Sequence, residues 1–215
     1  MVRNPRARRY LLRLRPDGTA RVTIPRGGSL AMARQFVERH AAWLERELQR
    51  LQVQPRIPAA WTIGTEILVR GDAVRIEAGP DGEAETVHFG SESVWVPDPA
   101  ADLRLTIEGH LRKLATRELP PRVLELATRH GLIVRRITVR SQKSRWGSCS
   151  RRGTISLNWR LIQTPAFVSD YICLHELVHL RQMNHSPGFW REMERACPDY
   201  RTAKRWLKEH PGLLR

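Results

Sequence analysis

The hydrophobic pattern in the first part of the chain changes from strand spacing to helix spacing. Residues 8–15 and 19–25 are strand-like, and the segment Pro16-Asp17-Gly18-Thr19 between them has the composition of a tight turn. Ser29 is a suitable N-cap for one long helix that extends to about residue 53. The apolar side chains of this helix recur near helical spacing at Phe36, Val37, Trp43, Leu44, Leu48 and Leu51.

Pro55 and Pro58 are expected to end this helix, because proline lacks the amide that a helix interior needs. Short strand-like segments follow, separated by turns that contain glycine, at 61–70, 73–78, 85–89 and 93–96. The composition shifts after Pro97 and Pro99. We therefore expect residues 1–100 to form a strand-rich N-terminal domain with one long helix.

The second half of the chain is mainly helical. A helical pattern runs from about 101 to 130 and closes at Gly131, and the pair Pro120-Pro121 is a place where the helix would restart. Strands are expected at 136–140 and 154–160, on either side of the loop 141–153.

A further helix is expected to begin at Thr164-Pro165, with the hydroxyl as its cap, and to reach about Met183. Pro187 opens a second helix and Pro198 a last one, which ends before Pro211. The predicted fold class is therefore α+β, in which residues 101–215 form a second domain of helices packed on a small sheet.

The net charge of +15 is distributed unevenly along the 215 residues. Residues 1–50 carry 12 basic and 4 acidic groups, residues 51–110 carry 4 and 10, and residues 111–215 carry 21 and 8. The basic excess attracts polyanions or phosphate-bearing ligands through a long-range field, although it specifies none of them.

The three cysteines, Cys149, Cys173 and Cys197, are odd in number and form no CxxC pair. A disulfide framework is not expected, and a reducing cytoplasmic compartment fits this usage best. Apolar runs are too short for a membrane span or a secretory signal, so no membrane partner is predicted.

The segment from Tyr171 to Leu180 contains the pattern His175-Glu176-Leu177-Val178-His179. On a helix, residues four apart point the same way, so both imidazoles share one face. The other residues of the segment are apolar or weakly polar around most of the helix, which is typical of a buried helix. Burying two histidines and a carboxylate without partners is costly, whereas a bound cation satisfies them, and HExxH on a helix therefore predicts zinc.

His185 is the best candidate for a third ligand, which requires the helix to end near Met183 or Asn184. Asn184 tolerates left-handed backbone angles and is expected to make the bend. Glu192 and Glu194 are weaker candidates, and His210 is distant in the sequence.

Three histidines leave one tetrahedral position of zinc open, as in catalytic zinc sites. A water molecule in that position becomes acidic, and Glu176 is expected to take its proton and pass it to the leaving group. The sequence therefore predicts one Zn²⁺ ion and a hydrolase.

The span from Ser141 to about Lys208 resembles the YgjP-like metallopeptidases, which are related to the SprT-like zinc proteases. The matching segments are Ser144-Arg145-Trp146-Gly147-Ser148-Cys149-Ser150, Ile155-Ser156-Leu157-Asn158, the HExxH helix, Asn184-His185-Ser186 and Phe189-Trp190. The resemblance implies a zincin-like catalytic domain, His175, His179 and His185 as zinc ligands, and Glu176 as the catalytic base. Some relatives carry the name UTP pyrophosphatase, so the resemblance leaves the reaction open.

Several residues near the motif are candidates for binding substrate: Arg145, Trp146, Asn158 and Tyr171. Tyr171 lies one turn before His175 and would either donate a hydrogen bond to a developing oxyanion or pack against the ligands. The strand 154–160 would either pair with an extended peptide substrate or serve as an ordinary sheet strand.

Residues 111–160 carry 13 basic and 2 acidic groups, which predicts either a solvated basic face or a surface for a nucleotide or nucleic acid. The leading hypothesis is a zinc metallopeptidase that acts on a polypeptide. The alternatives are a UTP pyrophosphatase with the same metal site and a nucleic-acid-associated module with a structural zinc.

Overall fold

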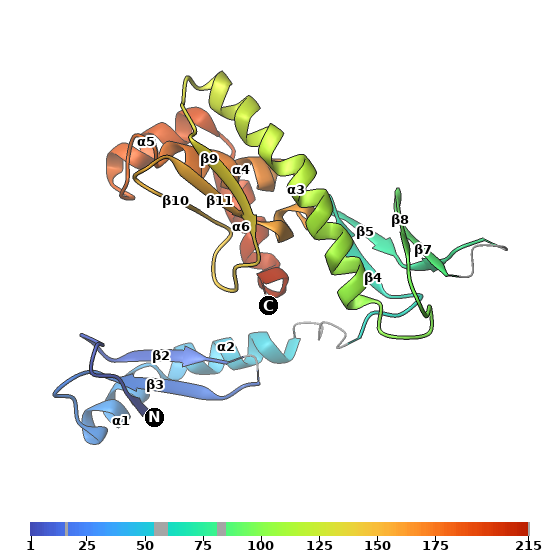
Figure 1. Ribbon diagram of the computed structural model, residues 1–215. Helices are drawn as coiled ribbons and strands as arrows, with labels where there is room; N and C mark the ends of the chain where they lie inside the picture. The colour runs from blue at the N-terminus through green and yellow to red at the C-terminus, as the bar shows by residue number, and fades with distance from the viewer. Residues whose placement is uncertain (16, 54–59, 81–84, 215) are drawn as a thin grey trace. The chain divides into compact units, whose positions relative to one another are not determined.

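A computed structural model of the protein describes residues 1–15, 17–53, 60–80 and 85–214 (Figure 1). The chain divides into two compact units, Met1–Ile57 and Pro58–Arg215. The predicted turn residue Pro16 and the predicted helix-ending residues Pro55 and Pro58 lie outside the described residues.

The boundary between the units differs from the expected one at residue 100. Strands from the acidic middle of the chain and helices from its second half contribute to one hydrophobic core, which includes Phe89, Val96, Ile107 and Leu157. A shared core joins these segments into a single unit.

The N-terminal unit contains a three-stranded sheet with the order β1-β3-β2. The predicted strands are present as β2 (Leu11–Leu14) and β3 (Ala20–Ile24), which pair antiparallel. The sequence did not predict β1 (Val2–Arg3), which pairs parallel with β3.

The prediction of one long helix in this unit is wrong, because the helix is interrupted at His40. α1 (Leu30–Arg39) begins at Ser29, whose hydroxyl accepts a hydrogen bond from the Met32 amide at 3.1 Å, as predicted for the cap. α2 (Ala41–Val53) follows at once. His40 has φ −109° and ψ 13°, and its Nδ1 donates to the Phe36 carbonyl at 2.8 Å, so its side chain helps to close α1.

The second unit begins with antiparallel strands that correspond to the predicted segments. β4 (Glu66–Val69) pairs with β5 (Asp72–Arg75), and β7 (Thr86–Phe89) pairs with β6 (Glu77–Ala78) and β8 (Glu92–Trp95).

α3 (Arg104–Arg129) is a 26-residue helix that contacts β8 near its start and β9 near its end (Figure 1). Pro120 and Pro121 lie inside it and do not restart it. An internal proline costs about 3 kcal/mol, and burial of the neighbouring side chains of Leu119 and Val123 offsets this cost. The helix closes as predicted before Gly131, which has φ +61°.

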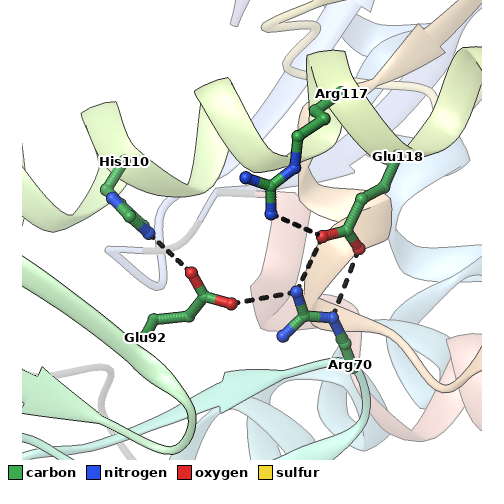
Figure 2. Close-up of polar contacts among 5 residues, drawn as sticks. All are labelled: Arg70, Glu92, His110, Arg117 and Glu118. Carbon is green, nitrogen blue, oxygen red and sulfur yellow. Dashed lines mark hydrogen bonds and ion pairs between the residues drawn. The ribbon is translucent and has the colours of Figure 1, made fainter.

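An ion-pair network holds the β4–β5 turn against α3 (Figure 2). Arg70 has φ +52° and precedes Gly71 with φ +96°, as in a two-residue hairpin turn that requires left-handed angles at both positions. The Arg70 guanidinium donates to Glu118 at 2.7 and 3.2 Å and to Glu92 at 2.9 Å, and Glu92 also pairs with His110. The network joins the turn, β8 and α3.

The same turn contacts the segment that leads into the next helix. The amides of Arg70 and Gly71 donate to the carbonyls of Ile162 and Gln163 at 2.7 and 3.2 Å. A Cβ atom on Gly71 would lie 2.6 Å from the ring of Pro165, so only glycine permits this approach.

The second half of the chain contributes a sheet with the order β10-β11-β9. β9 (Arg136–Arg140) and β11 (Thr154–Asn158) are the predicted strands and pair parallel. β10 (Gly147–Cys149) was expected to be loop, and it pairs antiparallel with β11. A 3-10 helix, η1 (Trp159–Gln163), replaces the last predicted strand residues.

α4 (Ala166–Val178) is the helix of the HExxH pattern, and both of its ends differ from the prediction. The Thr164 hydroxyl donates to the Leu161 carbonyl at 2.8 Å instead of capping α4, and Pro165 occupies the cap position. The helix ends at Val178, before the expected Met183. The predicted later helices are present as α5 (Pro187–Ala196) and α6 (Tyr200–Glu209), and η2 (Pro211–Leu214) follows them.

The fold is therefore mixed α and β, with six α-helices and several small sheets among the described residues. None of the described helices combines the length and apolar character that crossing a membrane requires.

Candidate metal centre

α4 is buried around most of its circumference, as its apolar sequence predicts. Its buried residues include Tyr171, Cys173, Leu174, Glu176 and Leu177. It contacts α3, α5, α6, β10 and β11, so it is enclosed by other elements of the second unit (Figure 1). Arg122 of α3 holds it through two parallel hydrogen bonds to Asp170, at 2.7 and 2.6 Å.

The structure brings the three predicted histidines together. One nitrogen atom from each of His175, His179 and His185 lies within 4.8 Å of the others. The Nε2 atoms of His175 and His185 are 3.0 Å apart. Two imidazole nitrogens this close cannot both carry a proton, so at least one presents its lone pair.

A backbone carbonyl fixes the tautomer of His179. Its Nδ1 lies 2.9 Å from the Gln182 carbonyl oxygen, which can only accept, so Nδ1 carries the proton. The lone pair is then on Nε2. This arrangement is characteristic of metal-ligating histidines, whose second nitrogen donates to a neighbouring acceptor.

Burial favours the neutral form, which is the form that binds metals, of the other two histidines. Burial, with smaller contributions from His179, His185 and Lys204, lowers the pKa of His175 to about 4. Burial likewise lowers the pKa of His185, although this side chain is exposed to solvent on one side.

The histidine set fits a divalent transition metal. Three imidazole nitrogens are the ligand type that zinc accepts. Among the described residues, these three form the only group of histidine, cysteine or carboxylate side chains close enough to hold an ion.

His185 reaches the site from the turn after α4. Ser186 caps α5 by accepting from the Phe189 amide at 3.3 Å, and Pro187 occupies the first turn of that helix. The expected left-handed bend at Asn184 is wrong, because Arg70 is the only described non-glycine residue with a positive φ. The early end of α4 makes such a bend unnecessary.

Phe189 packs against all three imidazoles. Its ring is fully buried, and its centroid lies 4.9 Å from His175, 4.7 Å from His179 and 4.7 Å from His185. The sequence analysis named Phe189 only as part of a segment that matches the family, and it predicted no role for this residue.

Glu176 directly follows His175 on α4, and its side chain is buried to 6% exposure. Burial raises its pKa to about 7, and the nearby Arg145 opposes the shift. A carboxylate with a pKa near neutrality is well matched to accepting and returning a proton.

Gly147 of β10 forms the wall beside Glu176. A Cβ atom at this position would lie 2.7 Å from both Cγ and Oε1 of Glu176. The sequence prediction missed this role, although a glycine within Trp146-Gly147-Ser148 was a usable signal of close approach.

A family model described as "YgjP-like, metallopeptidase domain" matches residues 8–210. The chain belongs to the YgjP-like family. The curated proteins and the solved structures contain no significant match to this chain.

The residues proposed to bind substrate in this YgjP-like chain occupy different surroundings. Asn158 is fully buried, and its Nδ2 donates to the carbonyls of Gln142 and Arg145 at 2.7 and 3.1 Å. It therefore braces the loop before β10. Trp146 in that loop packs against the main core, whereas Arg145 is exposed.

Tyr171 makes aromatic contacts. Its ring is edge-on to His175 with a centroid distance of 5.9 Å and stacks on Tyr200 at 6.3 Å. Trp190 continues this stack 5.6 Å beyond Tyr200, and the Lys204 ammonium lies 5.0 Å from the Trp190 ring centroid. An aromatic surface with a cation thus borders the histidines.

The alternative ligands have other partners. Glu192 lies 3.9 Å from Arg181, Glu194 lies 3.5 Å from Arg201, and the His210 ring stacks on Trp206 at 3.9 Å.

The cysteines of the YgjP-like domain are free. Burial raises the pKa of Cys149 to about 11 and that of Cys173 to about 12, so both remain thiols at neutral pH. Neither is suited to act as a nucleophile.

The basic segment 111–160 has two parts, one on α3 with ion-paired arginines and one on the sheet and its loops. Its α3 arginines contact acidic groups: Arg112 with Glu108, Arg117 with Glu118, Arg122 with Asp170, and Arg129 with Glu125. The exposed basic side chains of the sheet and its loops have no ion pair within the described residues. They are Arg135, Arg136, Arg140, Lys143, Arg145, Arg151 and Arg152.

Proposed function

We propose that the protein is a zinc-dependent metallopeptidase of zincin-like architecture, in which His175, His179 and His185 hold one Zn²⁺ ion and Glu176 is the catalytic base. The observation that carries the proposal is the convergence of three imidazoles, one of them adjacent in sequence to Glu176, a buried carboxylate with a raised pKa. When bound in such a site, zinc polarises the carbonyl under attack and acidifies the attacking water.

Glu176 performs the proton transfers. Its carboxylate accepts a proton from the attacking water as oxygen bonds to the peptide carbon, and returns that proton to the leaving nitrogen as the C–N bond breaks. A pKa near 7 makes both transfers feasible at neutral pH. Burial also keeps bulk water away from the carboxylate.

The peptide substrate would add to the sheet at β10. β11, for which pairing with substrate was one of two predicted roles, lies between β9 and β10, so both of its edges are occupied. β10 is an edge strand, and its Gly147 borders Glu176. An extended peptide that pairs with β10 would place its backbone beside the carboxylate, as in other cases of strand addition.

A test compares the zinc-loaded wild-type protein with Glu176→Gln on an unfolded polypeptide. We expect the variant to retain zinc, measured by elemental analysis, and to lose peptide cleavage by about 100- to 10,000-fold, the usual range for a general acid–base. Glu194→Gln is a matched control, because Glu194 is exposed and, among the described residues, forms an ion pair with Arg201. Equal activity of Glu176→Gln and the wild type would contradict the assignment.

The second candidate function is hydrolysis of UTP to a monophosphate and pyrophosphate at the same site. Arg145 favours it, because its positive charge acts on Glu176 and is suitably placed for a phosphate. The same preparation is offered UTP, with pyrophosphate release as the readout. Pyrophosphate release without peptide cleavage, abolished by Glu176→Gln, would replace the peptidase proposal.

A further inference from the structure

The charges of the N-terminal unit are segregated between the two faces of its sheet. Val22 and Ile24 of β3 point to the helix side and are buried, and Leu12 of β2 packs against them. The alternate residues Arg13 and Arg21 point to the opposite side and are exposed. The acidic residues described after the turn, Glu38, Glu45 and Glu47, lie on α1 and α2.

Arg13 and Arg21 are directly opposite each other in the antiparallel register. Like charges in this position destabilise a sheet, so a pair of this kind is unfavourable without a counter-ion. Within the described part of the chain, neither guanidinium has an ion pair. This arrangement is costly for folding and favourable for binding an anion.

A surface hollow of about 310 Å³ lies on the same side of the sheet. Its lining includes Arg8, Arg9 and Arg13 together with Asn4 and Thr23, which can also donate hydrogen bonds. No acidic side chain lines it among the described residues. We call Arg8, Arg9, Arg13 and Arg21 the arginine face.

We propose that the arginine face binds the sugar-phosphate backbone of a nucleic acid. Every basic residue among residues 1–50 is an arginine and none is a lysine. The planar guanidinium group of arginine can donate two parallel hydrogen bonds to phosphate oxygens. Arginine, asparagine and threonine are among the side chains that commonly contact backbone phosphates. A lipid surface fits less well, because peripheral membrane binding typically uses an amphipathic helix with a broad apolar face.

Six of the eight described carboxylates between residues 60 and 110 have partners in their own unit, so they are satisfied without the arginine face. Glu66 pairs with Arg75, Glu92 with Arg70, and Glu108 with Arg104 and Arg112. Three more accept hydrogen bonds from their own unit: Glu85 from the Trp95 indole, Asp98 from the Ala100 amide and Asp102 from the Trp61 amide.

The test measures binding of the full-length protein to fluorescein-labelled single-stranded DNA, duplex DNA and single-stranded RNA by fluorescence anisotropy. The variant is Arg13→Gln with Arg21→Gln. We expect its Kd to rise about tenfold or more, and the slope of log K against log salt to fall by roughly 1.4 to 1.8, because each lost phosphate contact contributes about 0.7 to 0.9. The three probes distinguish the nucleic acids that share this backbone chemistry.

The matched control is Arg34→Gln with Arg46→Gln, which removes the same charge from exposed positions on α1 and α2. We expect its Kd to remain within about twofold of the wild-type value, and both variants to hydrolyse a short peptide at the wild-type rate. Equal weakening by both variants would show a response to net charge only and would overturn the proposal. It would also be overturned if the wild type bound none of the probes, or bound only vesicles rich in phosphatidylserine.

The folded state of the double variant provides an independent check. Replacing two opposed arginines by glutamine relieves repulsion, so the thermal unfolding midpoint should be unchanged or higher. A loss of nucleic-acid binding with an intact unfolding transition therefore reports on contact with phosphate and not on unfolding.

Discussion

The two units differ in how their charged groups are used. In the Pro58–Arg215 unit, arginines are paired where they hold elements together, as Arg122 holds Asp170 of α4 and Arg70 holds Glu118 of α3. In the Met1–Ile57 unit, the arginines of the open sheet face have no ion pair within the described residues. The first arrangement holds helices and strands of that unit together, and the second leaves charge available for a ligand.

The units also differ in the size of their cores. The core of the N-terminal unit has Val22, Ile24 and Ala33 as its buried residues. The core of the other unit extends through α3, α4 and the sheets on both sides of α3. Burying a larger fraction of apolar surface gives greater stability, so the unit that must hold three histidines in register is the more stable one.

Removal of the metal should produce the largest difference between the two units. Dialysis against a chelator is expected to abolish hydrolysis, and the Pro58–Arg215 unit should remain folded because its core does not depend on the ion. A metal at 100 times its Kd adds about 2.7 kcal/mol to the stability of the unit that binds it. Scanning calorimetry should therefore show a lower midpoint for this unit alone, and activity should return with added Zn²⁺.

Truncating a core side chain should lower the free energy of unfolding of the unit that contains it by about 2–5 kcal/mol. The consequence should differ between the two units. Ile24→Ala is expected to unfold the N-terminal unit, because its core has few members to compensate, while hydrolysis of a short peptide persists. Leu157→Ala is the matched change in β11 and should reduce hydrolysis as well. Circular dichroism and activity are measured together; loss of activity in Ile24→Ala would show that the units are not independent.

Gly147→Ala tests the close approach of β10 to the Glu176 carboxylate, the proposed catalytic base. The added methyl group would lie 2.7 Å from Glu176 Oε1, so the carboxylate must move. We expect kcat to fall about 10- to 100-fold with unchanged zinc content, because displacements of this size are costly in catalysis. Gly109→Ala in α3 is the control, since a methyl group at that position would meet no neighbouring side chain within 4 Å, and it should leave kcat unchanged.

The smallest predicted effect is the pH dependence of the stability that the ion-pair network in Figure 2 provides. The hydrogen bond from Arg70 lowers the pKa of Glu118 below its usual 4.5. Burial raises the pKa of Glu92, but the hydrogen bonds from His110 and Arg70 together lower it by more than burial raises it, so the net shift is downward. Stability from these carboxylates is present above about pH 4.5 and is lost as the pH falls through their lower folded-state values.

Arg70→Gln should therefore reduce the free energy of unfolding at pH 7 by about 1 kcal/mol, since these groups are partly exposed. The difference from the wild type should shrink towards pH 3, as measured by urea denaturation. Arg75→Gln is the control, because Arg75 and its partner Glu66 are both 62% exposed. A difference that grows on acidification would contradict the predicted sign.

The sequence predicted the metal centre better than the elements that surround it. His175 and His179 are fixed by helical spacing, and turn chemistry at Ser186-Pro187 places the start of α5 next to His185. The network of Arg70 and the contact of Gly147 with Glu176 join residues distant in sequence, and local patterns do not identify the partners, although the glycine itself signals a close approach. The edge strand β10 is only three residues long, too short for a periodic signal.

Local propensity also misled in two places. Pro120 and Pro121 remain inside α3 because tertiary burial outweighs the proline penalty. His40 interrupts an otherwise helical pattern through its own side-chain bond to Phe36, which periodicity does not register.

The early end of α4 gives the three imidazoles unequal access to solvent. His175 lies on the buried helix and His179 at its C-cap, whereas His185 belongs to an exposed turn. An ion arriving from solvent would therefore meet His185 first.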